Sequence, residues 1–572
     1  MSSQATVHTE SIGLEDSSRR PTQVNRRPTA ALGISVAIMV AVIAGYVAYL
    51  ARYATNGVYW DEWNWVDLMR RSYGGTLTLG SLWAQHTENR MLFPNIVVVM
   101  LGDATGFSDV AFMYLGAILL VAGVLSLVVA CRQDLLAHPL AYVPATFVFF
   151  SLCQYENTLW GFQFAWFLIV ACICAVLALL SGPRLSVVAL LRAVTIGIVA
   201  SYSSFGGLTV WAAGLLALLR PGISMRLRIA WVAAGSLVTA FYVYDLNLRS
   251  VGGPTLSGFL TRLPTALNGY LVAVGSVVPI AAPVTRGSDL SATMIFGALI
   301  TVGGLLTVAS WMVNGRNDRV LTIAAGLVVV GLLFDLALMP TRLSAGVING
   351  TVSRYTTFNL LLLGGIYMGA VRTMFIALDR GMRPRIATST TFLGLAAALV
   401  LVQVLTAIHA GAIGGIRTRA AHAEAANLTA NHAVAPPSLV KVFAYPPSYA
   451  YFETEAAFLE RNHLNVFGDG ESAEYRASGV LAGGVVGSPL PVPPEFGNIQ
   501  SDASQWRAWL ALSSVYEQRP DLQAAFPGPT TQASRRMVAW AVRSGQNPTE
   551  PIYAPVLTPY SAQYAAWLGE EK

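Results

Sequence analysis

The stretch AALGISVAIMVAVIAGYVAYLA, residues 30–51, decides the class of fold. It carries no charged residue and is long enough to cross a bilayer as a helix, which takes about 20 residues. Nine residues later comes Trp60-Asp61-Glu62-Trp63, two adjacent carboxylates between two tryptophans. Tryptophan is enriched at the membrane–water interface. The sequence therefore predicts a membrane protein with an acidic pair at the depth of the lipid headgroups.

The composition of the whole chain agrees with this prediction. Hydrophobic residues make up 54% of its 572 residues and charged residues only 12%, whereas soluble domains carry about 25% charged residues. The four cysteines lie in or at the ends of apolar segments, so they indicate neither a disulfide framework nor a metal site. No basic run is interleaved with aromatic residues, and nucleic acid is therefore not an expected partner.

Apolar segments recur along the chain and predict an all-α polytopic bundle of about eleven transmembrane helices. They lie near 30–51, 108–131, 139–153, 159–181, 185–201, 207–219, 229–244, 290–313, 319–338, 355–376 and 386–410. Segments 139–153 and 207–219 are the weakest, and we expect either longer helices with polar ends or re-entrant pieces there. Residues 91–102 predict a half-inserted helix at the interface.

The arginines predict the orientation, because cytoplasmic loops collect Lys and Arg. Four arginines precede the first span, and the later clusters fall on the same side when the spans are threaded from an inner N-terminus. Residues 1–29 are then expected to be a disordered cytoplasmic tail. Residues 30–410 form the transmembrane domain with an outer loop at 52–107, and 411–572 form a small extracytoplasmic soluble domain. The expected location is the bacterial plasma membrane.

Asp61 and Glu62 are the candidate catalytic residues. One carboxylate can act as a general base that takes the proton of an attacking hydroxyl, an effect worth about 10²–10⁴-fold. The other can orient that hydroxyl or help to bind a divalent cation, since carboxylate oxygens suit Mg²⁺ or Mn²⁺. The alternative is a solvated helix start, where the helix dipole favours acidic residues.

Further polar residues on the same predicted side are candidate substrate-binding residues. Arginine or histidine can contact a phosphate there, with carboxylates and amides fixing its position. The alternative is structural, with ion pairs, caps and arginines that extend toward the interface. The candidates are His86, Glu88, Arg90, Glu156, Asn157, Gln163, Arg354 and Tyr355. Asp335, inside a predicted span, is expected to pair with Arg342 or Arg354.

This arrangement resembles the GT-C superfamily of membrane glycosyltransferases, polytopic proteins with an acidic pair in the first outer loop. Besides Asp61-Glu62, the stretches 85–94, 155–163 and 203–207 are similar to bacterial members of that class. The resemblance covers roughly residues 30–410 and does not extend to the soluble domain.

The resemblance implies a polyprenyl-phosphate-sugar donor bound from the outer leaflet. It also implies direct displacement at the anomeric carbon, usually with inversion, onto a cell-envelope glycan, lipid or protein. Asp61 would then be the base, and Glu62 would assist it or a metal ion. Arg354 or Arg90 would hold the departing phosphate.

Two other functions are weighed against the transferase. A transporter or flippase of lipid-linked sugars predicts charges deep within spans and two similar halves, whereas the polar residues of this chain gather on one side. A scaffold whose outer domain binds envelope polymers would need only one span. The chain has no GxxxxGK[ST] loop, so direct use of ATP is not expected.

Overall fold

The computed structural model describes most of the membrane part of the chain. The described residues are 29–247, 255–278, 289–381, 386–432 and 443–468, with isolated positions at 435, 440, 441 and 472. Predicted features in 1–28 and most of 469–572, including helices expected near 503–517 and 531–544, lie outside the described residues.

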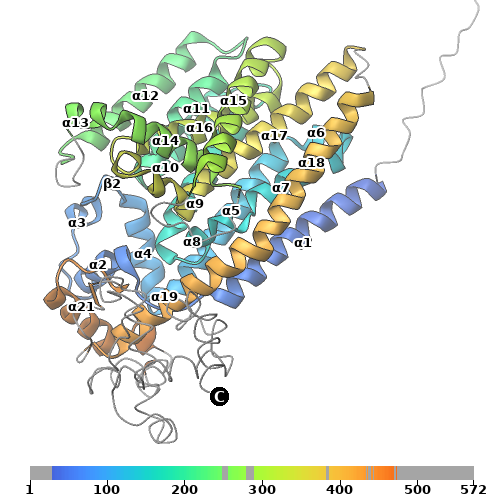
Figure 1. Cartoon of the computed structure of the whole chain (residues 1–572). Coiled ribbons are helices and arrows are strands. Elements are labelled where there is room, and N and C mark those ends of the chain that lie inside the picture. The colour runs from blue at the N-terminus through green and yellow to red at the C-terminus, as the bar shows by residue number, and fades with distance from the viewer. Residues whose placement is uncertain are drawn as a thin grey trace, which may run out of the picture.

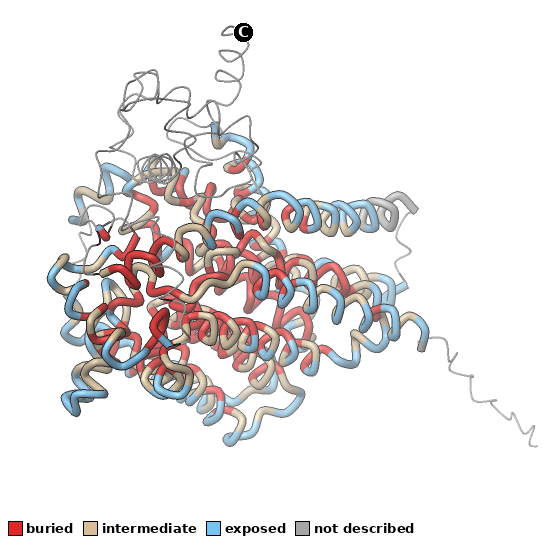
Figure 2. Tube along the Cα trace, turned by 90° about the horizontal axis from the view of Figure 1, so that it is seen from below, coloured by how far each residue is buried: buried red, intermediate tan, exposed pale blue. Residues whose placement is uncertain are grey.

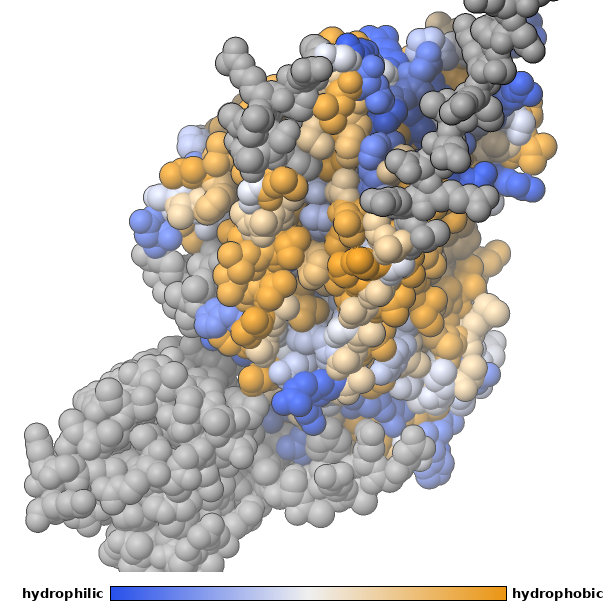
Figure 3. Space-filling view, turned by 90° about the vertical axis from the view of Figure 1, so that its right-hand side faces the viewer, coloured by the Kyte–Doolittle hydropathy of each residue, from blue (hydrophilic) through white to orange (hydrophobic). Residues whose placement is uncertain are grey.

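The described part of the chain is almost entirely helical. Its only sheet is a hairpin of two strands of two residues each, β1 (Gln85–His86) and β2 (Asn89–Arg90). Eight helices of the described residues are long and apolar enough to cross a membrane. They include all or most of α1 (Thr29–Tyr53), α5 (Asp109–Ala130), α9 (Phe164–Leu180), α12 (Met225–Val243), α15 (Ser291–Asn314), α16 (Arg319–Leu338), α17 (Thr356–Asp379) and α18 (Ile386–Thr406). Hydrophobic side chains cover a broad central band of the surface, with hydrophilic ones toward opposite edges (Figure 3). The chain is an all-α polytopic membrane protein, as the apolar segments predict.

The three other predicted spans are shorter helices. They are α7 (Val143–Phe149), α10 (Val187–Ser201) and α11 (Thr209–Leu218). Two of them are the segments that the sequence marks as weakest. A sharp turn at Gly207 precedes α11, and a Cβ atom there would lie 1.8 Å from the carbonyl oxygen of Ala200. A helix, α4 (Leu92–Thr105), is found where the sequence predicts a half-inserted helix at 91–102, and its half-insertion stays a prediction.

The centre of the bundle is buried, and two helices lie at its outer edge. α9 is apolar on all faces, as expected for a helix surrounded by protein, and α16 is apolar apart from Arg319, Thr322 and Asp335. In the two spans, 67% and 72% of the residues are buried. In α1 and in the span that contains α18, the share is 11%. Figure 2 shows the resulting red interior and the pale outer helices. Helices α1 and α18 lie at the same margin of the bundle (Figure 1).

The structure contains a partly buried helix in a segment where the sequence analysis predicts no span. This helix, α14 (Leu263–Gly275), packs against α15. The two backbones cross closely because glycines stand at the contact: a Cβ atom at Gly275 would lie 2.0 Å from the oxygen of Thr293. A Cβ atom at Gly297 would lie 1.9 Å from the oxygen of Leu271. Small residues allow such approaches between membrane helices.

Gly297→Ala is therefore expected to destabilise the bundle. The new methyl group would force α14 and α15 apart, and overpacking of this kind costs about 1–3 kcal/mol. Gly303→Ala, in the same helix, is the matched control because its Cβ atom would meet only Ile366 at 3.5 Å. The control should be neutral or gain up to about 1 kcal/mol of helix propensity. Thermal unfolding in detergent micelles measures both, and equal midpoints would contradict the close crossing.

One end of the bundle carries a second hydrophobic core that joins distant parts of the chain. Here α2 (Trp63–Tyr73) packs against α21 (Tyr449–Arg461), with the rings of Trp63 and Phe452 5.1 Å apart. The hydroxyl of Tyr451 donates to the carbonyl of Trp63 at 2.9 Å, and Arg70 Nε donates to Glu455 at 2.8 Å. In Figure 1, α2, α4 and α21 gather at this end.

The helix is not interrupted at the predicted domain boundary near residue 410. A π-helical turn, Ala407–Gly411, continues α18 directly into α19 (Ala412–Ala430). Described residues between 425 and 467 then share one core with the first loop. The described beginning of the predicted C-terminal domain is thus packed onto residues 52–107.

Candidate functional site

The two adjacent carboxylates point in different directions. They lie in a single 3₁₀ turn, Trp60–Glu62, in which successive side chains are about 120° apart. The side chain of Asp61 is 37% exposed, whereas Glu62 is 2% exposed. The preceding Trp60 has the left-handed backbone (φ 48°), a costly conformation that surrounding packing must hold in place.

Glu62 is bonded to the backbone on both sides. Its Oε2 accepts the N–H of Tyr59 at 2.8 Å, which is the capping arrangement of a helix start. Its Oε1 accepts the N–H of Phe162 at 3.0 Å, from a segment 100 residues further along the chain. The alternative interpretation, an acidic helix start, therefore describes Glu62, although the residue is buried rather than solvated.

Two groups that the sequence analysis did not single out lie beside Glu62. Asp109 begins α5 and His422 lies in α19; both are buried, and His422 Nδ1 is 3.6 Å from Asp109 Oδ2. Burial raises the pKa of the Glu62 carboxyl well above its usual value, and the neighbouring Asp109 raises it further. The only sequence signal for Asp109 is its place after Ser108, which reads as an ordinary helix cap.

Asp61 faces a histidine from the small hairpin. His86 Nε2 is 3.5 Å from Asp61 Oδ1, and the histidine ring lies 5.5 Å from that of Phe162. The antiparallel pairing of β1 with β2 sets the position of His86 opposite Asn89. Asn89, which the sequence analysis did not select, ties the hairpin to the bundle, because its Oδ1 accepts the hydroxyl of Ser204 at 2.7 Å.

Arg354 lies in the 3₁₀ turn Ser353–Tyr355, just before α17. Its guanidinium is within electrostatic range of Asp61, but the carboxylate with which it pairs is that of Glu156. Glu156 Oε2 accepts the backbone N–H of Arg354 at 3.1 Å and lies 3.8 Å from Nη1. Asn157 donates to the carbonyl of Arg354 at 2.7 Å. The predicted residues Glu156 and Asn157 thus position Arg354.

The other predicted binding residues make contacts with groups other than Asp61. Arg90 is 4% exposed and donates to the carbonyls of Trp83 and Tyr244, so its guanidinium faces backbone oxygens. Glu88 binds Arg342 through both carboxylate oxygens at 3.0 and 3.1 Å. Gln163 and Tyr355 are buried, and the Tyr355 ring stacks 6.3 Å from Trp166.

The prediction that Asp335 pairs with Arg342 or Arg354 is wrong. Arg342 pairs with Glu88, and Arg354 pairs with Glu156. Asp335 is fully buried within α16, where its charge would be costly without a partner. In the described parts of the chain it takes part in no ion pair with either arginine.

The geometry gives no preformed cation site at the acidic pair. Among the described residues, no three His, Cys, Asp or Glu side chains are grouped so that they could hold a metal ion. The different directions of the Asp61 and Glu62 side chains agree with this. Binding of Mg²⁺ or Mn²⁺ stays a prediction, and a substrate phosphate would have to complete the ligand set.

Comparisons with known proteins give one partial likeness. A segment of 117 residues is 35% identical to the Na(+)/H(+) antiporter NhaA 2 of Clavibacter michiganensis subsp. michiganensis. It covers 20% of this chain and 28% of that protein, which is too little to assign a family. No protein-family model matches the chain, and no solved structure matches it.

Proposed function

We propose that the chain is a membrane glycosyltransferase. It would move a sugar from a polyprenyl-phosphate donor to a glycan, lipid or protein acceptor on the outer face of the plasma membrane. The observation that carries the proposal is the grouping of Asp61, His86 and Arg354. A partly exposed carboxylate, an imidazole and a guanidinium come from three distant segments to one end of a membrane bundle.

Each group has a role in one displacement. Asp61 accepts the proton of the acceptor hydroxyl as the hydroxyl oxygen attacks the anomeric carbon. The bond from that carbon to the phosphate oxygen breaks, and the polyprenyl phosphate leaves with the electron pair. Arg354 offsets the charge that develops on the phosphate, for which its planar donors are suited. His86 orients Asp61.

Glu62 supports this site instead of reacting. Its two bonds to Tyr59 and Phe162 fasten the turn that presents Asp61. The buried Asp109 and His422 belong to the same support.

Arg354→Gln is expected to weaken use of the lipid donor. Loss of a charged hydrogen bond to phosphate costs about 1.5–3 kcal/mol, or roughly 10–100-fold in kcat/KM. Arg342→Gln is the matched control, since Arg342 is an exposed arginine of the same loop region that binds Glu88 instead. Kinetics with varied donor concentration give the comparison, and equal values for both variants would remove Arg354 from phosphate binding.

An ion-coupled transporter is the second candidate. The partial likeness to a protein named as a Na(+)/H(+) antiporter favours it, as does the buried Asp335, because ionisable groups inside spans often serve transport. The transferase accounts better for the exposed groups around Asp61.

Proteoliposomes separate the two functions. The purified chain would be supplied with a panel of radiolabelled polyprenyl-phosphate sugars and envelope acceptors, and product formation measured. A second set would carry an internal pH dye and receive a Na⁺ pulse. Sugar transfer without a pH response supports the transferase, whereas a Na⁺-dependent pH change without transfer favours the antiporter.

A further inference from the structure

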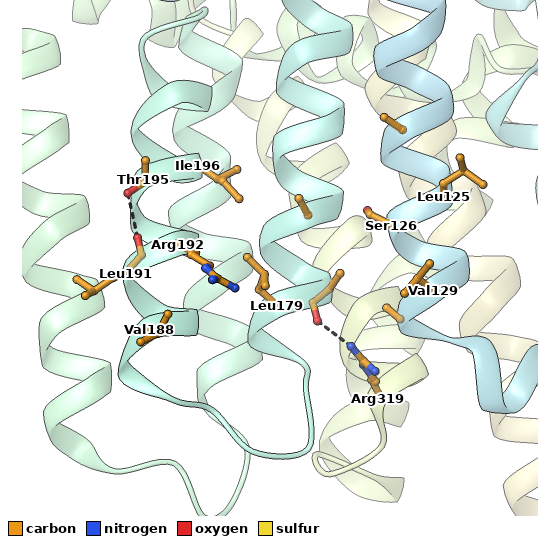
Figure 4. Close-up of a pocket in the computed structure, with 14 residues that line it drawn as sticks. Leu125, Ser126, Val129, Leu179, Val188, Leu191, Arg192, Thr195, Ile196 and Arg319 are labelled. Carbon is orange, nitrogen blue, oxygen red and sulfur yellow. Dashed lines mark hydrogen bonds between the residues drawn. The ribbon is translucent and has the colours of Figure 1, made fainter.

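An open apolar groove lies between α5, α9 and α10, away from the candidate site. Its volume is about 870 Å³. The walls include Leu125 and Val129 of α5, Leu179 of α9 and Leu191 of α10 (Figure 4). Leu125, Val129 and Leu191 are among the exposed hydrophobic residues of the chain. All three helices belong to the membrane bundle, so the groove opens toward lipid.

Two arginines line this groove, whose other lining residues are apolar except for Ser126 and Thr195. Arg192 is the sixth residue of α10, about 8 Å from the helix start, and Figure 4 shows its guanidinium inside the groove beside Leu179. Arg319 lies at the lower end in that view and donates to the carbonyl of Ala178 at 2.9 Å. None of the described residues that line the groove is acidic. A positive charge inside a membrane helix is costly unless an anion lies beside it.

The groove continues into a more polar cavity. This second cavity has a volume of about 550 Å³ and shares Ala130 and Arg319 with the groove. It adds Arg132, an exposed residue just after α5, and it also contains Asp134 and Asp318, which both pair with Arg372. An apolar channel that ends at Arg319, beside these charged groups, matches the two chemical parts of a phospholipid.

We infer that the groove is a binding site for an anionic phospholipid. One acyl chain lies between α5, α9 and α10, and the headgroup phosphate is bound by Arg192 and Arg319. Basic pockets between membrane helices recognise anionic lipids in this way. A zwitterionic lipid offers the same chain, but its own positive charge offsets the attraction of the phosphate for the arginines.

The site is independent of the proposed transferase function. Asp109, at the start of α5, lies beside Glu62, whereas Ala130 at the other end lines the groove. The helix has 22 residues and is about 33 Å long. The lipid is therefore not the sugar donor of the site at Asp61, and the two proposals can fail separately.

The test measures lipid binding to the full-length protein in detergent. Native mass spectrometry and thermal unfolding would be run with dioleoylphosphatidylglycerol, dioleoylphosphatidylcholine or inorganic phosphate. We expect retained phosphatidylglycerol and a raised unfolding midpoint, with little effect of the other two. Arg192→Gln should weaken phosphatidylglycerol binding by about tenfold or more, while Arg226→Gln, an exposed arginine outside the groove, should leave it unchanged.

A second variant tests the acyl-chain part. Ala175→Phe places a ring in the groove wall and should displace the chain, so that phosphatidylglycerol binding falls although both arginines remain. Equal binding of phosphatidylglycerol and phosphatidylcholine would overturn the anionic specificity. An equal midpoint shift with inorganic phosphate would reduce the site to a free anion site. Unchanged lipid binding in both groove variants would overturn the site altogether.

Discussion

Asp61→Asn is expected to lower sugar transfer by about 10²–10⁴-fold, the usual contribution of a general base. The amide keeps the size and polarity of the carboxylate but cannot accept the acceptor proton. Asp61 is partly exposed, and its Oδ1 lies 3.5 Å from His86 Nε2, so the variant should fold normally. Initial transfer rates at saturating donor and acceptor provide the measurement.

The control for this variant is Asp103→Asn. Asp103 lies near the end of α4 at the same end of the bundle, and its Oδ1 accepts the hydroxyl of Tyr73 at 3.2 Å. Its replacement removes one negative charge from the same surface without touching the proposed site. Full transfer by Asp61→Asn, or an equal loss in both variants, would contradict the assignment of Asp61 as the base.

Glu62→Ala is expected to reduce stability, by about 2–6 kcal/mol. The substitution leaves the partly buried N–H of Tyr59 and the buried N–H of Phe162 without an acceptor, and each unsatisfied donor costs about 1–3 kcal/mol. Glu62→Gln retains a carbonyl oxygen for one of them and should lose less. Unfolding midpoints of the three proteins in the same detergent rank them, and a wild-type midpoint for Glu62→Ala would contradict the bonding described.

The pH dependence of stability provides a sharper check on Glu62. Its pKa in the folded protein is raised above the ordinary value of 4.5, so the folded chain holds a proton that the unfolded chain releases. Stability contributed by this proton is present below about pH 4.5 and is lost as the pH rises toward the folded pKa. Glu62→Gln should flatten this decline, whereas Asp103→Asn should keep it.

The membrane architecture follows from local sequence. An apolar run of about 20 residues has few stable alternatives to a spanning helix, so each of the eight long apolar helices overlaps a predicted span, although the last one, Leu393–Ala430, continues well past the predicted end at residue 410. Helix α14 was missed because its glycines lower the hydropathy and helix propensity of a segment that tertiary packing then buries. The close crossing depends on contacts with α15, and no pattern within the α14 segment predicts those contacts.

The candidate site was predicted in part. Two adjacent carboxylates suggest that both act in the same site. The 3₁₀ turn instead leaves the Asp61 side chain partly exposed and places that of Glu62 in the core. Arg90 and Arg354 look alike in sequence, yet only the fold shows that the first faces backbone carbonyls and the second lies near Asp61. Asp109 and His422 reach Glu62 through long-range packing, which composition and spacing do not encode.

The glycan composition of the cell envelope in a deletion strain tests the central claim most directly. The strain would be complemented with the wild type, Asp61→Asn or Asp103→Asn, with protein levels matched in the membrane fraction. The account predicts the loss of one sugar linkage, its return with the wild type and Asp103→Asn, and no return with Asp61→Asn. An unchanged envelope in the deletion strain, or full restoration by Asp61→Asn, would contradict it.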